Sequence, residues 1–174
     1  MRQRVLTRYK SLDERRFLAA TAGATIGVLV TLLVVSLIAD DGHQEQFEAA
    51  TVLRVIDGDT VELTSGERVR YIGIDTSELF PETQCRAQEA AELNRYLVEG
   101  KEVELLPGPE NRDRFGRLLR YVFAENVFVN AQLVREGLAR ARGFHRNERF
   151  RQVLVQLAID AKTAGWGFWA ECGW

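Results

Sequence analysis

A segment in the second quarter of the chain constrains the fold most. It holds three short runs rich in β-branched residues: Thr51–Ile56, Thr60–Thr64 and Arg68–Ile74. Asp57-Gly58 separates the first two runs, and Ser65-Gly66 separates the second from the third. Such pairs between alternating apolar runs are a strong hairpin signal, because the tight turns between antiparallel strands need positive φ angles. The segment therefore predicts a three-stranded antiparallel meander.

Carboxylates and one arginine lie at or near the ends of these predicted strands. Asp57 and Asp59 flank the first turn. Asp75 and Glu78 follow the third run, and Arg70 lies within it. Turn chemistry alone explains Asp57, because an Asp side chain commonly hydrogen-bonds its own turn. The group as a whole also suggests a hard-metal site facing a phosphate, and spacing alone leaves both interpretations open.

Four sequence blocks follow one another between about residues 51 and 165. They are V-I-D-G-D-T-V-E-L, R-V-R-Y-I-G-I-D-T-S-E, D-R-F-G-R-L-L-R-Y-V-F and V-N-A-Q-L-V-R-E-G-L-A. Their content and order resemble the staphylococcal nuclease (thermonuclease) family. The resemblance implies an α+β domain with the OB-fold, a five-stranded β-barrel, and three helices. Periodicity alone predicts only an α+β fold with a small barrel or sheet.

The sequence after the meander predicts three helices and three strands. Apolar spacing and end signals predict helices over 87–97, 130–135 and 147–164, with Asn130 and Asn147 as N-caps. The strands are expected at Glu102–Leu106, Leu118–Phe123 and Val127–Val129. We expect Pro107-Gly108-Pro109 to end the first of these strands, with a charged loop over 110–115.

The family resemblance implies a Ca²⁺ site. The family holds calcium with two Asp carboxylates and one backbone carbonyl, and the matching positions here are Asp59, Asp75 and the main chain of Thr76. Asp57 matches a neighbouring acidic position. Calcium suits such a set because it takes oxygen ligands in a loose shell.

The resemblance also implies a catalytic set. Glu78 matches the family's general base, and Arg70 and Arg117 match its two phosphate-contacting arginines. One departure is Phe115, which stands where the best-known member has a tyrosine that contacts the nucleotide's terminal phosphate. Phe115 is a candidate for apolar or stacking contact with the substrate, and Arg114, beside it, is a candidate for that phosphate contact.

Together these matches imply a calcium-dependent nuclease that hydrolyses DNA and RNA, leaves 3′-phosphate ends and acts as a monomer. The alternative is a non-catalytic OB-fold module that binds nucleic acid or protein. We favour the enzyme because a decayed module would be expected to have lost at least one of five residues. These are Asp59, Arg70, Asp75, Glu78 and Arg117.

An uncharged apolar segment, Phe17–Ala39, is long enough to cross a bilayer as a helix. Basic residues predominate before it and two aspartates follow it, so the positive-inside rule places the N-terminus in the cytoplasm. We therefore expect a basic cytoplasmic segment (1–16), a transmembrane anchor (17–39), a linker (40–49) and an extracytoplasmic OB-fold domain (50–174). The alternative is a cleaved signal peptide, which would give a secreted protein.

The composition of the predicted exported part adds two expectations. Both cysteines, Cys85 and Cys172, lie in it and form a candidate disulfide, the alternative being two unrelated buried thiols. Residues 1–39 contribute four net positive charges to a total of −2, so residues 40–174 carry about −6. That balance argues against a broad basic face, although it allows a small site with two or three arginines.

Overall fold

Three antiparallel strands form the predicted meander in the computed structural model, which describes residues 46–143 and 146–172. They are β1 (Glu48–Asp57), β2 (Thr60–Leu63) and β3 (Arg68–Tyr71). Val61 and Leu63 on β2 are buried, while Glu62 between them is partly exposed. This alternation confirms that one face of the meander forms the core.

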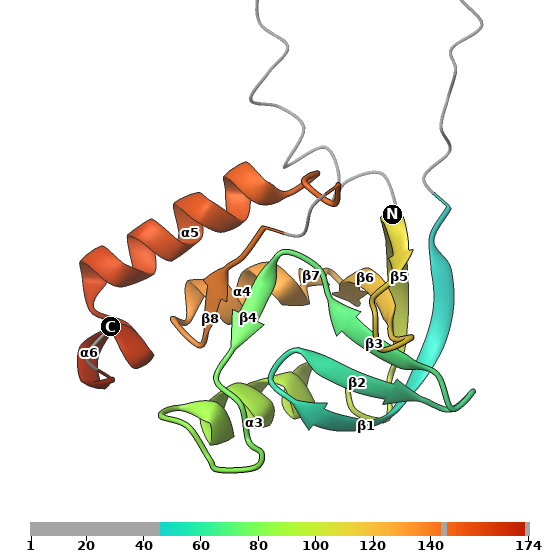
Figure 1. Cartoon of the computed structure of the whole chain (residues 1–174), viewed down its shortest axis with the longest axis horizontal. Coiled ribbons are helices and arrows are strands. Elements are labelled where there is room, and N and C mark those ends of the chain that lie inside the picture. Colours follow the sequence, from blue (N-terminus) through green and yellow to red (C-terminus); the bar gives the residue numbers. More distant parts are fainter. Residues whose placement is uncertain (1–45, 144–145, 173–174) are drawn as a thin grey trace, which may run out of the picture. The chain divides into compact units, whose positions relative to one another are not determined.

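Two long strands close the meander into a barrel (Figure 1). β5 (Glu102–Arg112) pairs antiparallel with β1, and β6 (Leu118–Ala124) pairs antiparallel with β5. β6 then pairs with β3 in parallel, which completes a ring of five strands. The predicted five-stranded barrel is therefore confirmed, and the short β7 (Val127–Phe128) extends it at the edge of β6.

The prediction that β5 ends before Pro107 is wrong. The strand continues to Arg112, with an irregular register between Pro107 and Arg112. Asn147, which we expected to cap a helix, contacts this irregular part: its Oδ1 accepts from the Glu110 amide at 3.0 Å, and its Nδ2 donates to the Glu110 carbonyl at 3.2 Å. A distant side chain therefore supports the strand where prolines interrupt the regular ladder.

The three predicted helices are present, and the described residues contain a fourth of one turn. They are α3 (Ala87–Val98), α4 (Val129–Arg135), α5 (Arg151–Ala164) and α6 (Phe168–Glu171). α4 starts one residue earlier than predicted, so Asn130 is not its cap. Its buried side chain instead accepts from the Val122 amide and donates to the Ile72 carbonyl.

A second, two-stranded sheet lies beside the barrel and was not predicted. β4 (Ile74–Thr76) pairs antiparallel with β8 (Ala139–Ala141), and Asp75 is directly opposite Arg140. Gly73, at a φ of 81°, turns the chain from β3 into β4. This turn brings Arg70, which precedes it, close to Asp75, which follows it.

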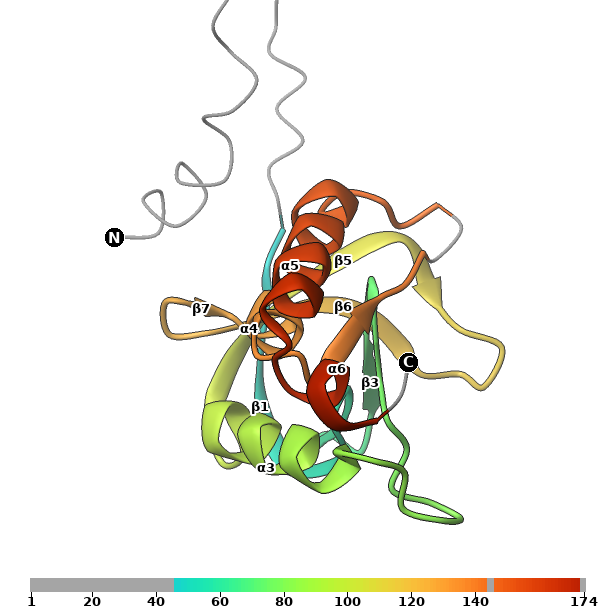
Figure 2. The ribbon, with the colours of Figure 1, turned by 90° about the vertical axis from the view of Figure 1, so that its left-hand side faces the viewer.

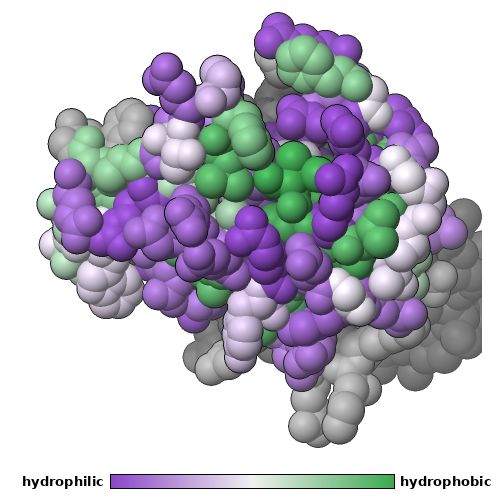
Figure 3. Space-filling view, turned by 90° about the horizontal axis from the view of Figure 1, so that it is seen from below, coloured by the Kyte–Doolittle hydropathy of each residue, from purple (hydrophilic) through white to green (hydrophobic). Residues whose placement is uncertain are grey.

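Helices cover the barrel at two ends (Figures 1 and 2). α3 packs on β1, and α4 packs on β6 and α5. The aromatic rings of Tyr121, Phe128 and Phe150 fill the space between β6, β7 and the start of α5, with the Tyr121 and Phe150 centroids 4.7 Å apart. Seen from the α3 side, hydrophilic side chains predominate, with smaller apolar patches between them (Figure 3).

The predicted membrane anchor at residues 17–39 lies outside the described residues. Within 46–143 and 146–172, no helix combines the length and apolar character that crossing a membrane requires.

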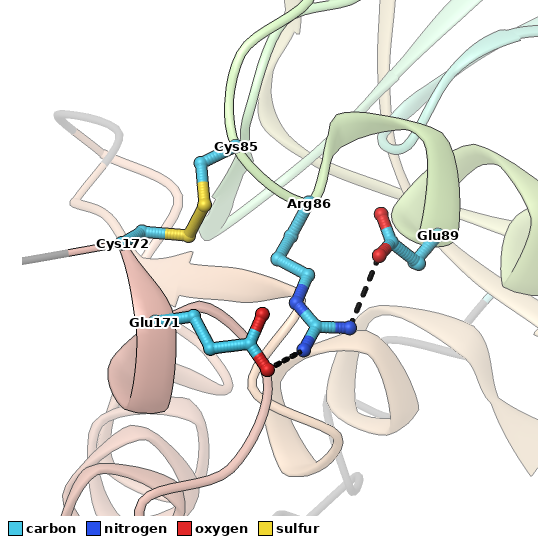
Figure 4. The surroundings of a disulfide bond; sticks show 5 residues. All are labelled: Cys85, Arg86, Glu89, Glu171 and Cys172. Atoms are coloured by element: carbon cyan, nitrogen blue, oxygen red, sulfur yellow. Dashed lines mark hydrogen bonds and ion pairs between the residues drawn. A yellow bond between two sulfur atoms is a disulfide. The ribbon is translucent and has the colours of Figure 1, made fainter.

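A disulfide joins Cys85, just before α3, to Cys172, just after α6, with their Cα atoms 5.9 Å apart (Figure 4). Arg86 supports the same junction. Its Nη2 lies 2.6 Å from Glu171 Oε1, and its Nη1 lies 3.0 Å from Glu89 Oε1. The end of the described chain is thereby fastened to the segment that follows Glu78.

We expect reduction of this disulfide to lower the free energy of unfolding by about 2–4 kcal/mol, because it closes a long loop in the unfolded chain. Urea unfolding with and without dithiothreitol measures the difference. A Cys85→Ser/Cys172→Ser variant should match the reduced parent and should not respond to dithiothreitol. Equal stability of the oxidised and reduced parent would contradict the expectation.

Candidate functional site

The turn between β1 and β2 places two aspartates at one end of the barrel. Asp57 Oδ1 accepts a hydrogen bond from the Asp59 amide at 3.0 Å, as expected of a turn aspartate. The buried Asn94 of α3 donates to the Asp57 carbonyl at 3.1 Å. A Cβ at Gly58 would collide with Ala90 and Thr76. Only glycine therefore lets this turn pack between α3 and β4.

Arg70 brings Asp59 and Asp75 together. Its guanidinium is buried, with Nη1 2.6 Å from Asp59 Oδ2 and Nη2 2.8 Å from Asp75 Oδ1. Nη1 also donates to the Ile74 carbonyl at 3.1 Å. Arg70 therefore holds one carboxylate from the β1–β2 turn and one from β4 around a single cation.

The charge on Asp59 is strongly influenced by burial. Its side chain is only 4% exposed, and burial raises its pKa from 3.8 to about 7. Arg70 opposes this rise, whereas the Asp57 carboxylate adds to it. The Thr76 amide, which donates to Asp59 Oδ2 at 2.9 Å, also favours the ionised form. A further cation beside Asp59 would favour ionisation in the same way.

Glu78 lies in the same electrostatic neighbourhood. Partial desolvation raises the pKa of its carboxyl, and Asp57 and Asp75 raise it further. Arg70 and Arg117 lower it, although the net shift remains upward. The backbone of Glu78 is fixed by Gln84, whose side chain accepts from the Glu78 amide at 3.0 Å. Both arginines therefore lie close enough to Glu78, the predicted base, to lower its pKa.

Arg117 comes from the loop between β5 and β6. Its Nε lies 2.7 Å from Asp113 Oδ2, and the same aspartate accepts from the Arg117 amide. Its Nη1 makes a long contact of 3.5 Å with Thr60 Oγ1, which donates to Asp59 Oδ1 at 3.2 Å. Thr60 thus links Arg117 to the buried aspartate, a connection that the sequence motifs did not indicate.

Phe115 and Arg114 lie on the same loop, at the surface. The ring of Phe115 is 68% exposed, and it stacks against the guanidinium groups of Arg114 at 4.7 Å and Arg117 at 5.5 Å. An exposed aromatic ring held by two cations offers a stacking surface and positive charge together. Contact of both residues with substrate stays a prediction.

Arg142 is a site residue that sequence reasoning missed. It follows β8, and its Nη1 lies 2.9 Å from Asp75 Oδ1, the oxygen that Arg70 also contacts. Its side chain is 59% exposed. The pairing of β8 with β4 brings it there, and no local motif predicts that pairing.

The predicted calcium ligands can be tested against these contacts. Among residues 46–143 and 146–172, no three or more His, Cys, Asp or Glu side chains form a metal-binding cluster. A set of two carboxylates and one carbonyl would not form such a cluster. Asp59, Asp75 and the Thr76 main chain supply hard oxygen donors, and a cation beside Asp59 would favour the ionised form that a metal ligand needs. These residues therefore fit a calcium ion.

Comparison with known proteins places the chain among nucleases. The family model described as "Staphylococcal nuclease homologue" matches residues 68–171. The chain is 32% identical to the thermonuclease of Staphylococcus intermedius over 162 residues, which cover 86% of this chain and 96% of that protein. It is 30% identical to endonuclease YncB of Bacillus subtilis over 140 residues, 76% of this chain and 66% of that protein. It is also 31% identical over 132 residues to the SPbeta prophage-derived endonuclease YokF of the same species, covering 71% of this chain and 45% of that protein.

Proposed function

The chain belongs to the staphylococcal nuclease family, and on this basis we propose that it is a nuclease that hydrolyses phosphodiester bonds in DNA and RNA. The proposal includes dependence on Ca²⁺ and products with 3′-phosphate ends. The observation that carries it is the contact of Arg70 with both Asp59 and Asp75, within the electrostatic reach of Glu78 and Arg117. Two cations and a base beside paired carboxylates suit phosphodiester hydrolysis.

Each charged residue has a distinct role in this proposal. Asp59, Asp75 and the Thr76 carbonyl would hold Ca²⁺, which supplies Lewis-acid polarisation of the phosphate. Glu78 accepts a proton from the attacking water, and its raised pKa suits a carboxylate that must bind a proton during the reaction. Arg70 and Arg117 bind phosphoryl oxygens, where planar guanidinium groups match the geometry of the anion.

The alternative is an OB-fold module that binds nucleic acid or protein without cleaving it. The contacts of Arg70 favour the enzyme. A buried arginine beside a carboxylate whose pKa is raised by burial is costly to keep in a fold, and a binding surface has no need of it.

We also propose that the domain works outside the cytoplasm and that residues 17–39 anchor it in the membrane. Basic residues predominate before that segment and two aspartates follow it, which supports this orientation. The Cys85–Cys172 disulfide supports it too, because disulfides persist in oxidising compartments. Protease added to intact cells should then digest the domain.

Calcium removal tests the proposed activity. Single-stranded DNA and RNA incubated with the full-length protein should be cleaved with Ca²⁺, and cleavage should stop when a chelator is added. End-group analysis should find 3′-phosphates. In calorimetric titrations, Asp75→Ala should bind Ca²⁺ more weakly than the parent, whereas Asp160→Ala, a surface change on α5, should not. A parent protein that binds DNA but does not cut it with Ca²⁺ would favour the binding module.

A further inference from the structure

Arginines are concentrated in one short stretch of a domain that is otherwise acidic. Between Arg140 and Arg151 the sequence has five arginines and one glutamate, although residues 40–174 carry about six net negative charges. The stretch runs from β8 to the first residue of α5, two elements that pack against each other. This short segment therefore carries a local excess of positive charge.

Two adjoining hollows lie along this stretch. The first has a volume of about 100 Å³, and Arg142, Arg151 and Val155 are among its lining residues. The second, more open hollow is lined by Glu148, Arg149, Arg151, Gln152 and Val155. The hollows share the lining residues Glu148, Arg151 and Val155 and so lie next to each other, and we call the two together the β8–α5 groove.

The β8–α5 groove begins at the reaction centre. Arg142 lines it and also contacts Asp75 at 2.9 Å, on the oxygen that Arg70 contacts at 2.8 Å. A phosphate bound at Arg70 would therefore lie close to Arg142. From there the groove passes Arg151 and reaches Arg149.

The groove has a net positive lining and one apolar surface. Its lining includes three arginines, Arg142, Arg149 and Arg151, and one carboxylate, Glu148. Glu148 Oε1 lies 2.9 Å from Arg151 Nη1. The Arg151 side chain remains 57% exposed, and the guanidinium of Arg149 lies 5.6 Å from the Phe150 ring centre. Val155, at 40% exposure, adds apolar surface. A row of arginines matches the phosphates of single-stranded nucleic acid, and Val155 offers apolar contact beside them.

We propose that the β8–α5 groove binds the sugar-phosphate backbone of single-stranded nucleic acid beyond the scissile phosphate. This inference rests on the proposed function. Arg142 contacts the phosphate next to the reaction centre, and Arg149 and Arg151 contact phosphates further along the strand. A duplex would need a broader basic face than this acidic domain offers.

Binding measurements test the groove independently of cleavage. Fluorescence anisotropy of a labelled 20-nucleotide DNA, measured with a chelator over a range of salt, gives the slope of log K against log salt. Each phosphate contact to a single strand contributes about −0.7 to that slope, so Arg149→Gln/Arg151→Gln should make it shallower by about 1.4. Arg149→Lys/Arg151→Lys keeps both charges and should retain the parent slope.

A matched control shows whether the change in salt slope comes from the groove or from the overall charge of the protein. Arg95→Gln/Arg135→Gln removes the same charge from exposed positions on α3 and α4, and it should leave the salt slope unchanged. Circular dichroism establishes that each variant is folded. Equal slopes for the groove variant and the parent would overturn the proposal, and so would a larger loss of binding to duplex than to single-stranded DNA.

The length of the nucleic-acid substrate provides a kinetic test of the groove. The parent should prefer the 20-nucleotide substrate over a dinucleotide in kcat/KM, and Arg149→Gln/Arg151→Gln should reduce that preference about tenfold, the effect of two solvent-exposed ion pairs. The two proposals fail differently. If no protein cleaves but the salt slope changes as expected, the nuclease proposal fails and the groove stands. If the parent cleaves and the groove variant keeps the parent's length preference and slope, the groove proposal fails alone.

Discussion

Replacing Glu78 with glutamine is expected to lower kcat by about 10²–10⁴-fold, because the substitution removes the group that accepts the water proton. The fold at this position should persist. Gln84 contacts the Glu78 backbone in both directions, with its side chain 3.0 Å from the Glu78 amide and its own amide 2.9 Å from the Glu78 carbonyl. Neither contact uses the Glu78 side chain, so glutamine should occupy the same place.

Single-turnover cleavage with Ca²⁺ measures the effect on kcat, and DNA anisotropy measures binding. Binding should change little, because Arg70 and Arg117 supply the phosphate contacts in our proposal. Glu82→Gln is a matched control, since it makes the same change at an exposed position in the same loop and should leave kcat unaltered. A Glu78→Gln enzyme that cleaves at the parent rate would show that Glu78 is not the base.

Replacing Arg70 with alanine should abolish detectable cleavage and lower the free energy of unfolding by about 3–5 kcal/mol. The large stability effect follows from burial. The Arg70 and Asp59 side chains are 6% and 4% exposed, so the substitution leaves a buried carboxylate without its cation. Asp75, at 29% exposure, loses one partner but retains Arg142.

The exposed pair Arg54–Glu62 is a control with matched geometry. Its closest atoms are 2.6 Å apart, as in the Arg70–Asp59 pair, but the Arg54 side chain is 57% exposed. Arg54→Ala should therefore cost no more than about 1 kcal/mol in urea unfolding. Adding Asp59→Asn to Arg70→Ala should recover part of the stability and none of the activity. Equal losses for Arg70→Ala and Arg54→Ala would contradict a role for the buried charge.

The barrel was predictable where local rules decide the structure. Asp57-Gly58 and Ser65-Gly66 signal tight turns, and the alternation through Val61 and Leu63 fixes which face is buried. The motif residues on this meander could likewise be placed near one another, because strand ends joined by short turns stay close. Arg70, Asp59 and Asp75 are indeed in direct contact.

The parts that sequence reasoning missed depend on partners distant in the chain. Pro107 ends a strand by local rules, yet β5 continues past it because Asn147 supports the Glu110 backbone. Asn147 therefore does not cap α5, although its local sequence favours capping. Arg142 reaches Asp75 because β8 pairs with β4, and a strand of three residues leaves almost no periodic signal.

Barrel closure also determines when in folding the chain becomes able to cut nucleic acid. β3 and β6 join residues about fifty positions apart, so this pairing requires the intervening chain to be ordered. Leu118, the neighbour of Arg117, pairs with Val69, the neighbour of Arg70. A partly folded chain that has only its hairpins would hold Arg70 without Arg117 beside it. The nuclease that we propose would therefore have only one of its two phosphate-binding arginines in place until β3 and β6 pair.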